Sequence, residues 1–184
     1  LNTVWWSPGL HSPLWTTTNL SDLTGAPTLV GNISSSTTSW NGMQVMGTDE
    51  QGHLISIWWS PSSAGWHWTD LTQATDGQAL ASGSISSVVT PWNGISVVGR
   101  TATNELVTYW WTPNTNQWTF ESITAEQQGE SSLRIAGPTS FVINPQSRQQ
   151  HIAGMDENGH LVHLYWTPQD DIWHVEDLTA FAIS

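Results

Sequence analysis

The chain has no cysteine and no lysine, and among its 184 residues the only permanently cationic side chains are three arginines. Without cysteine there is neither a disulfide framework nor a thiolate metal ligand, and the redox compartment leaves no mark on the sequence. The chain has 15 carboxylates against the three arginines Arg100, Arg134 and Arg148, which gives a formal net charge of -12. Because a field of this sign repels phosphate, we expect neither nucleic acid nor an anionic membrane surface as a partner.

Long apolar runs are missing as well. No run approaches the roughly 20 residues that cross a bilayer, so membrane insertion is not expected. No stretch keeps an apolar period of 3.6 residues for long, so the sequence predicts no helix of substance. The chain begins Leu1-Asn2-Thr3, without an initiator methionine or the apolar region of a signal peptide, and we expect a processed or excised piece.

Tryptophan, glycine and proline are abundant instead, with 14, 15 and 9 residues respectively. The tryptophans recur at a spacing of 52 residues, so that Trp40, Trp58 and Trp66 reappear as Trp92, Trp110 and Trp118. A third copy, offset by a further 55 residues, contains Tyr165, Trp166 and Trp173. A repeat of this length with strand-like content predicts a solenoid, an array or a propeller.

Turn residues divide each copy into four strands. The first strands are expected at 31–40, 83–92 and 137–144, and the second at 43–48, 95–101 and 151–156. The third strands, which are the aromatic ones, are expected at 54–59, 106–111 and 161–166. The fourth strands begin at Trp66, Trp118 and Trp173 and run into Asp70-Leu71-Thr72 or its counterparts.

Four short antiparallel strands in each repeat predict an all-β fold, a β-propeller built of four-stranded blades. The third strand supports this assignment through its two faces. Alternation places Ile55 and Ile57 on one side and Leu54 and Ser56 on the other, so that both sides are largely apolar. A blade between two neighbours needs such a strand, whereas a sandwich strand with one solvated face does not.

The repeats define the expected domain organisation. Residues 1–24 supply a half blade with only the third and fourth strands, and 25–72, 73–124 and 125–179 form blades 1, 2 and 3, followed by a linker at 180–184. Propellers typically contain about 4 to 8 blades, and this chain provides about three and a half. Either a parent protein supplies further blades, or chains associate as a homo-oligomer. Two copies would carry 28 strands, the content of seven blades, so a two-fold dimer is one expected arrangement.

Aromatic residues beside polar ones are the candidates for ligand binding. The second tryptophan of each pair (Trp6, Trp59, Trp111 and Trp166) is predicted to pack between blades. The first aromatic of the pair has a polar handle, and the tryptophan that opens the fourth strand stands beside a polar residue; both suit a platform for a sugar ring or core packing. The candidate ligand-binding residues are Gln44, Trp58, Trp66, His67, Ser96, Trp110, Trp118, His151, His163, Tyr165 and Trp173.

No metal, cofactor or catalytic site is expected. His53 and His160 occupy the same turn position in two copies, too far apart to share a metal, and are expected to be solvated turn residues. Asp156-x-Asn158-Gly159 fits turn chemistry and lacks the rest of a calcium loop. There is no Gly-x-Ser-x-Gly elbow, and the carboxylates specify no glycosidase pair, so the protein is not expected to be an enzyme.

The motifs Gly52-His53-Leu54, Trp58-Trp59, Gly65-Trp66-His67 and Asp70-Leu71-Thr72 resemble those of tryptophan-rich bacterial propeller repeats related to the fucose-binding lectin propellers. The resemblance covers essentially the whole chain and implies a sugar-binding propeller. In the fucose lectins an arginine on the second strand and a glutamate on the third hold the sugar. The matching positions here are Gln44, Ser96 and His151 on the second strand and Ser56, Thr108 and His163 on the third.

These observations predict a lectin-like, multivalent carbohydrate-binding module, secreted or displayed at the cell surface, whose partners are glycans or small sugars. One alternative is an architectural or protein-interaction propeller that assembles by oligomerisation. The other is a fragment of a glycoside hydrolase.

Overall fold

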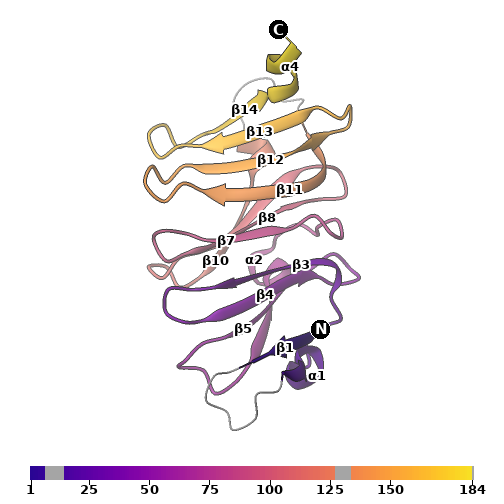
Figure 1. Cartoon of the computed structure of the whole chain (residues 1–184), viewed down its shortest axis with the longest axis vertical. Helices are drawn as coiled ribbons and strands as arrows, with labels where there is room; N and C mark the ends of the chain where they lie inside the picture. The colour runs from indigo at the N-terminus through magenta and orange to yellow at the C-terminus, as the bar shows by residue number, and fades with distance from the viewer. Residues whose placement is uncertain (7–14, 127–133, 184) are drawn as a thin grey trace.

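The computed structural model describes residues 1–6, 15–126 and 134–183, and its described part is built from 14 strands and four short helices. The strands form three four-stranded antiparallel sheets and one two-stranded sheet. Every sheet is a meander in chain order, as expected for propeller blades. In Figure 1 the sheets follow one another along the long axis, from the two-stranded sheet near the N-terminus to the last four-stranded sheet.

The two-stranded sheet, the half-blade, pairs β1 (Asn2–Trp5) with β2 (Thr16–Asn19). Blade 1 contains β3 (Val30–Thr37), β4 (Met43–Thr48), β5 (Leu54–Trp59) and β6 (His67–Asp70). Blade 2 contains β7 (Ser86–Val89), β8 (Ile95–Arg100), β9 (Leu106–Trp111) and β10 (Trp118–Ser122). Blade 3 contains β11 (Ile135–Ile143), β12 (Gln150–Asp156), β13 (Leu161–Trp166) and β14 (Trp173–Asp177).

The predicted propeller blades are confirmed, and the third strand of each blade has the predicted bounds. The half-blade pairs the strands that contain Trp5 and Thr16, while Ser7 and Pro8 of its predicted turn lie outside the described residues. Strand β5 shows why the assignment worked: Leu54, Ile55, Ser56 and Ile57 are all buried, so both faces of the sheet are covered. The first strand of blade 2 is shorter than predicted at both ends, because residues 83–85 come before the pairing with β8 begins and residues 90–92 belong to the turn that follows it.

Four short helices follow the fourth strands, where the sequence predicted none. They are α1 (Leu20–Thr24), α2 (Leu71–Thr75), α3 (Ile123–Glu126) and α4 (Leu178–Ile183). The predicted blade boundaries at 72, 124 and 179 therefore fall inside helices, and the segment predicted as a linker is helical up to Ile183. A helix of one turn buries a single apolar residue, such as Leu71, and leaves no 3.6-residue pattern to detect.

The Asp-Leu-Thr motif, or its counterpart in the half-blade and in blade 2, explains how these helices begin. Asp70 caps α2, its side chain accepting the Gln73 amide proton at 2.9 Å. Leu71 is fully buried in the core. The Thr72 hydroxyl accepts the amide proton of Leu54 at 2.9 Å, which satisfies the donor that begins β5. Thr124 and Thr179 accept the amide protons of the equivalent residues in blades 2 and 3, at 2.8 Å each.

Two hydrophobic clusters join neighbouring blades. One joins Met46, Leu54 and Leu71 of blade 1 to Val97 and Tyr109 of blade 2. The other continues the packing from blade 2 to blade 3. The innermost strands also approach closely, because a Cβ atom on Gly31, at the start of blade 1, would lie 2.7 Å from the Gly83 amide nitrogen.

Two further findings limit what the fold contains. Within residues 1–6, 15–126 and 134–183, no helix has both the length and the apolar character of a membrane span. The same part of the chain gathers no group of three or more histidine or carboxylate side chains suited to a metal ion.

Candidate functional site

Pockets lie at the junctions between consecutive sheets. A pocket of about 310 Å³ lies between blades 1 and 2, and one of about 460 Å³ lies between blades 2 and 3. We name them the Thr69 pocket and the Glu121 pocket after the residue that β6 or β10 contributes. The two linings use the same repeat positions with different side chains, so the pocket is a repeated feature of the fold.

The Thr69 pocket takes one wall from blade 1 and the other from blade 2. Blade 1 contributes Gln44 from β4, Ser56 and Trp58 from β5 and Thr69 from β6. The blade 2 wall is formed by Ile95, Trp111, Asn116 and Trp118. The indole Nε1 of Trp58 donates to the Thr69 hydroxyl at 3.2 Å, which fixes the ring across the sheet.

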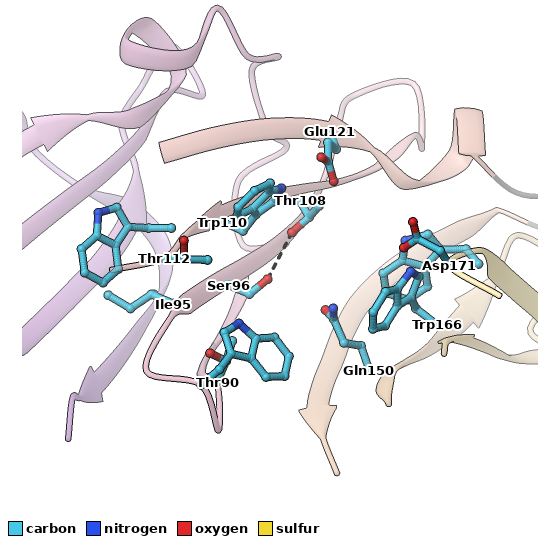
Figure 2. Close-up of a pocket in the computed structure, with 13 residues that line it drawn as sticks. Thr90, Ile95, Ser96, Thr108, Trp110, Thr112, Glu121, Gln150, Trp166 and Asp171 are labelled. Carbon is cyan, nitrogen blue, oxygen red and sulfur yellow. Dashed lines mark hydrogen bonds between the residues drawn. The ribbon is translucent and has the colours of Figure 1, made fainter. Parts of the chain in front are cut away.

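The Glu121 pocket repeats this arrangement one blade further on (Figure 2). Blade 2 provides Ser96, Thr108, Trp110 and Glu121, the counterparts of the four residues just described for blade 1. Blade 3 provides Gln150, Trp166, Asp171 and Trp173. Figure 2 shows Ser96 and Thr108 between the aromatic walls; their hydroxyls are hydrogen bonded at 3.3 Å. Glu121 lies opposite Thr108 in the strand register, so its carboxylate enters from β10.

A tight turn adds one more tryptophan to each pocket. In blade 1 the hydroxyl of Thr38 accepts the amide proton of Gly42 at 2.8 Å, and Asn41 adopts a φ of 62°. The turn places Trp40 on the rim of the Thr69 pocket. The same turn recurs in blade 2, where Trp92 lines the Glu121 pocket. A Cβ on Gly42 would lie 2.8 Å from the Thr38 hydroxyl, so the turn requires glycine.

The second tryptophan of each pair lies between blades, as predicted, but it borders the pockets and is only half-buried. Trp111 lines both pockets, and its ring centroid lies 5.6 Å from that of Trp40. Trp6 of the half-blade is 50% exposed. Ile57 and its counterpart Tyr109, two residues earlier on this strand, are fully buried.

A third pocket, the N-terminal pocket, lies between the half-blade and blade 1 and has a volume of about 730 Å³. The half-blade contributes Trp5 and Trp6, and blade 1 contributes Gln44 and Trp66. Trp66 therefore occupies the place that Trp118 and Trp173 occupy in the other two pockets.

The outer face of blade 3 carries the same positions in a histidine-rich form. His151 Nδ1 and His163 Nε2 are 3.1 Å apart, and His163 Nδ1 lies 3.2 Å from Glu176 Oε2. The rings of His163 and Tyr165 stack at 5.5 Å, and those of Tyr165 and His174 at 4.7 Å. Burial, together with the nearby charge of His163, lowers the pKa of His151.

Polar groups in the pockets are incompletely paired. Ser56 is buried, and within the described residues neither its hydroxyl nor the Oε1 atom of Gln44 has a hydrogen-bond partner. A buried polar atom without a partner costs about 1–3 kcal/mol, which a ligand that supplies the bond can recover. Both residues line the Thr69 pocket, whereas their counterparts in the Glu121 pocket bond to each other.

The structure distributes the predicted ligand-binding residues over four places. Gln44, Trp58 and Trp118 meet in the Thr69 pocket, and Ser96, Trp110 and Trp173 meet in the Glu121 pocket. Trp66 lies in the N-terminal pocket. His151, His163 and Tyr165 form the face of blade 3. His67 is not among the lining residues; its ring stacks on Trp58 with centroids 4.8 Å apart.

Sequence reasoning missed the residues that only cross-strand register and blade packing bring in. They are Trp40, Trp92, Thr69, Glu121, Asn116 and Asp171. The sequence could have indicated Glu121, because it follows Trp118 by three residues, and residues three apart on a strand lie on opposite faces of the sheet. The pairing of Glu121 with Thr108 then shows that it lies on the face of the Glu121 pocket. His53 and His160, expected as solvated turn residues, have side chains that are 38% and 44% exposed, and they are also hydrogen bonded to Asp70 at 2.7 Å and Asp177 at 2.9 Å.

No model of a known protein family matches the sequence, and no curated protein matches it. Solved structures do match. A lectin from Burkholderia pseudomallei is similar with a TM-score of 0.60 and 15% identity, over 80% of this chain and 42% of that one. The SapL1 lectin, solved in complex with alpha methyl fucoside, is similar with a TM-score of 0.56 and 14% identity, over 88% of this chain and 51% of that one. A fucose lectin from Kordia zhangzhouensis, solved with methyl-fucoside, is similar with a TM-score of 0.50 and 14% identity, over 79% of this chain and 97% of that one.

The chain thus spans about half or less of the first two lectins. At these identities the likeness concerns the fold: the protein shares the bladed, all-β architecture of lectin propellers.

Proposed function

We propose that the protein is a lectin-like, multivalent carbohydrate-binding propeller that binds sugars in the pockets between its blades. The observation that carries this proposal is the recurrence of one pocket, with several tryptophans around a few polar groups, at successive blade junctions. Indole faces stack on the apolar faces of sugar rings, and the polar groups hold hydroxyls. More than one pocket in a chain would make binding multivalent.

The similar lectins support the proposal, since two of them were solved with methyl-fucosides. The polar ligands of this chain differ from those of the fucose lectins, however. At the positions of the arginine and the glutamate, the Thr69 pocket has Gln44 and Ser56, and the Glu121 pocket has Ser96 and Thr108. We therefore expect sugars bound by neutral hydrogen bonds and stacking in the Thr69 pocket, with modest affinity at each site.

Tryptophan fluorescence tests the proposal, because a stacked sugar perturbs the emission of an indole. We expect titration with a panel of simple sugars to change the emission of the natural chain, and Trp58→Ala together with Trp110→Ala to weaken binding at least tenfold, a loss of about 1.4 kcal/mol. Trp68→Ala is the control, because it removes a tryptophan that is exposed and lies outside the pocket linings. Silence towards every sugar on a glycan array would contradict the proposal and favour an architectural propeller.

The lectin function implies binding without catalysis and a place outside the cell or on its surface. A glycoside hydrolase would need two carboxylates set for acid and nucleophile or base chemistry across the bound sugar. The Thr69 pocket has none in its lining, whereas the Glu121 pocket has Glu121 and Asp171, so the hydrolase alternative applies to that pocket alone. Turnover of chromogenic glycosides would overturn the assignment as a non-enzyme.

We propose further that chains associate through their aromatic outer faces. Trp15 of the half-blade, the counterpart of Trp66, is 69% exposed and lies outside the lining of the N-terminal pocket, and the stacked face of blade 3 carries pocket-forming positions. Association of two copies would cover both surfaces in the way that blades cover each other within the chain. Light scattering measures the outcome, and a monomer mass at binding concentrations would contradict it.

A further inference from the structure

The two complete pockets differ in charge at matching positions. Where the Thr69 pocket has Thr69 and Asn116, the Glu121 pocket has Glu121 and Asp171. The backbone is the same at both pairs: Thr69 lies opposite Ser56 and Glu121 opposite Thr108. Asn116 and Asp171 have φ values of 52° and 60° in equivalent loops. The geometry is thus retained while two neutral side chains are exchanged for carboxylates.

In the described part of the chain, the carboxylate groups of Glu121 and Asp171 form no hydrogen bond or ion pair. The three arginines are all within the described residues, and none of them lines the pocket. Figure 2 shows the two carboxylates on different blades, Glu121 above Thr108 and Asp171 beside Trp166. They therefore bring negative potential to the pocket from both walls.

The remaining walls are aromatic. Trp92, Trp110 and Trp111 come from blade 2, and Trp166 and Trp173 come from blade 3. Indole faces carry negative potential and attract an ammonium group, more strongly when water is partly excluded. A cavity that combines indole faces with free carboxylates is suited to an organic cation, while its volume of about 460 Å³ accommodates a sugar ring.

We infer that the Glu121 pocket is specific for sugars that carry a protonated amino group, such as a hexosamine, whereas the Thr69 pocket takes neutral sugars. The inference rests on the proposed lectin function and assigns a ligand class to one of its sites. Glu121 and Asp171 determine the specificity, and Trp110, Trp166 and Trp173 hold the ring.

The test isolates each pocket and compares a hexosamine with its N-acetyl form and the parent hexose, by calorimetry near pH 6. Trp58→Ala disables the Thr69 pocket and keeps the Glu121 pocket, and Trp110→Ala does the reverse, since each residue lines only one of them. The N-terminal pocket, which neither residue lines, is present in both proteins, so the difference between the two proteins reports the Thr69 and Glu121 pockets. In the Trp58→Ala protein we expect the hexosamine to bind about fivefold more tightly than the N-acetyl form, the size of a partly screened charge pair. In the Trp110→Ala protein we expect no preference.

Exchange of the charged positions provides the matched controls. Glu121→Thr with Asp171→Asn gives the Glu121 pocket the polar residues of its neighbour and should abolish the preference while hexose binding remains. Thr69→Glu with Asn116→Asp should create the preference in the Thr69 pocket. Equal preferences in both pockets, or a preference unaffected by the exchange, would overturn the inference. Binding of none of the three sugars to either pocket would instead count against the proposed function.

Discussion

At the scale of single residues, repeat positions divide into those that hold the blade and those that face a pocket. His53 belongs to the first group, although it lies in a turn beside a glycine and its side chain is partly exposed to solvent. Its Nδ1 atom lies 2.7 Å from Asp70 Oδ2 on the strand that ends the blade. The same pair recurs as His160 and Asp177 in blade 3. The Gly-His-Leu and Asp-Leu-Thr motifs are therefore two parts of one structural contact.

The His53 contact makes stability depend on pH. The hydrogen bond with Asp70 raises the pKa of His53 above its ordinary value of 6.5, against the effect of burial, with further help from the charges of Asp70 and Asp49. The folded state therefore holds a proton that the unfolded chain releases as pH rises above 6.5, so the stabilisation is complete below this value and is lost as pH rises through the folded pKa. Since the His53 side chain is 38% exposed, the contribution is under about 1 kcal/mol.

Asp70→Asn isolates this effect, because asparagine also caps a helix but carries no charge. We expect nuclear magnetic resonance titration to give a His53 pKa closer to the ordinary value in the variant. The decline of the unfolding free energy with rising pH should flatten in parallel. An unchanged His53 titration would show that the contact does not set the pKa.

At the scale of elements, the short helix after each fourth strand ties the blade to its third strand. Thr72→Val keeps the side-chain volume but removes the acceptor for the Leu54 amide, and both residues are buried. We expect a loss of about 1–3 kcal/mol in the free energy of unfolding by denaturant titration, the cost of an unpaired buried donor.

Thr119→Val is the control for this substitution, since Thr119 lies on β10 and is only half-buried. A valine there should change stability by less than about 0.5 kcal/mol. Equal losses at both positions would mean that the hydroxyl of Thr72 is not the group that matters.

How much of an element can be predicted from the sequence depends on how the element is stabilised. The third strands were predicted with correct bounds because Leu54 to Trp59 is apolar on both faces, a pattern that only a covered sheet explains. The helices were missed because one helical turn depends on a cap and one buried leucine. Half of each pocket was missed for another reason. Thr69 and Glu121 lie in the pockets because of their pairing with β5 and β9, which the sequence does not specify. Asn116 and Asp171 come from the adjacent blade, so only the packing of blades brings them to the pocket.

At the scale of the whole molecule, stability rests on contacts between blades. Gly31 shows how close these contacts are: its φ of 74° and the 2.7 Å from its Cβ position to the Gly83 amide leave no room for a side chain. Gly25 has the same φ but nothing within 4 Å of its Cβ position. Gly25→Ala should therefore cost about 1 kcal/mol, from the backbone alone.

Gly31→Ala adds the clash between blades to this backbone cost. We expect its loss of unfolding free energy, measured by denaturant titration, to exceed that of Gly25→Ala by about 1–3 kcal/mol, as for other overpacked sites. Similar losses for the two alanines would show that the inner strands can move apart at little cost.

Trp111 couples the two pockets to each other, since this one side chain lines both of them. Trp111→Phe keeps an aromatic ring with a smaller face. We expect it to weaken sugar binding about two- to fivefold at both sites, a change of about 0.4–1 kcal/mol. Calorimetry in the Trp58→Ala and Trp110→Ala backgrounds resolves the two sites. An effect confined to one of them would mean that the other does not use this wall.

The pockets also bear on how such a chain can change by duplication. A blade is one complete four-stranded sheet, but a pocket takes one half from each of two consecutive blades, as blade 2 provides Ser96 and Glu121 to one pocket and Trp118 to the other. The pocket is therefore shifted by half a repeat relative to the sheet. Duplication of one blade would therefore add one complete pocket at the new junction. The lining of that pocket would combine two walls that already exist in the chain.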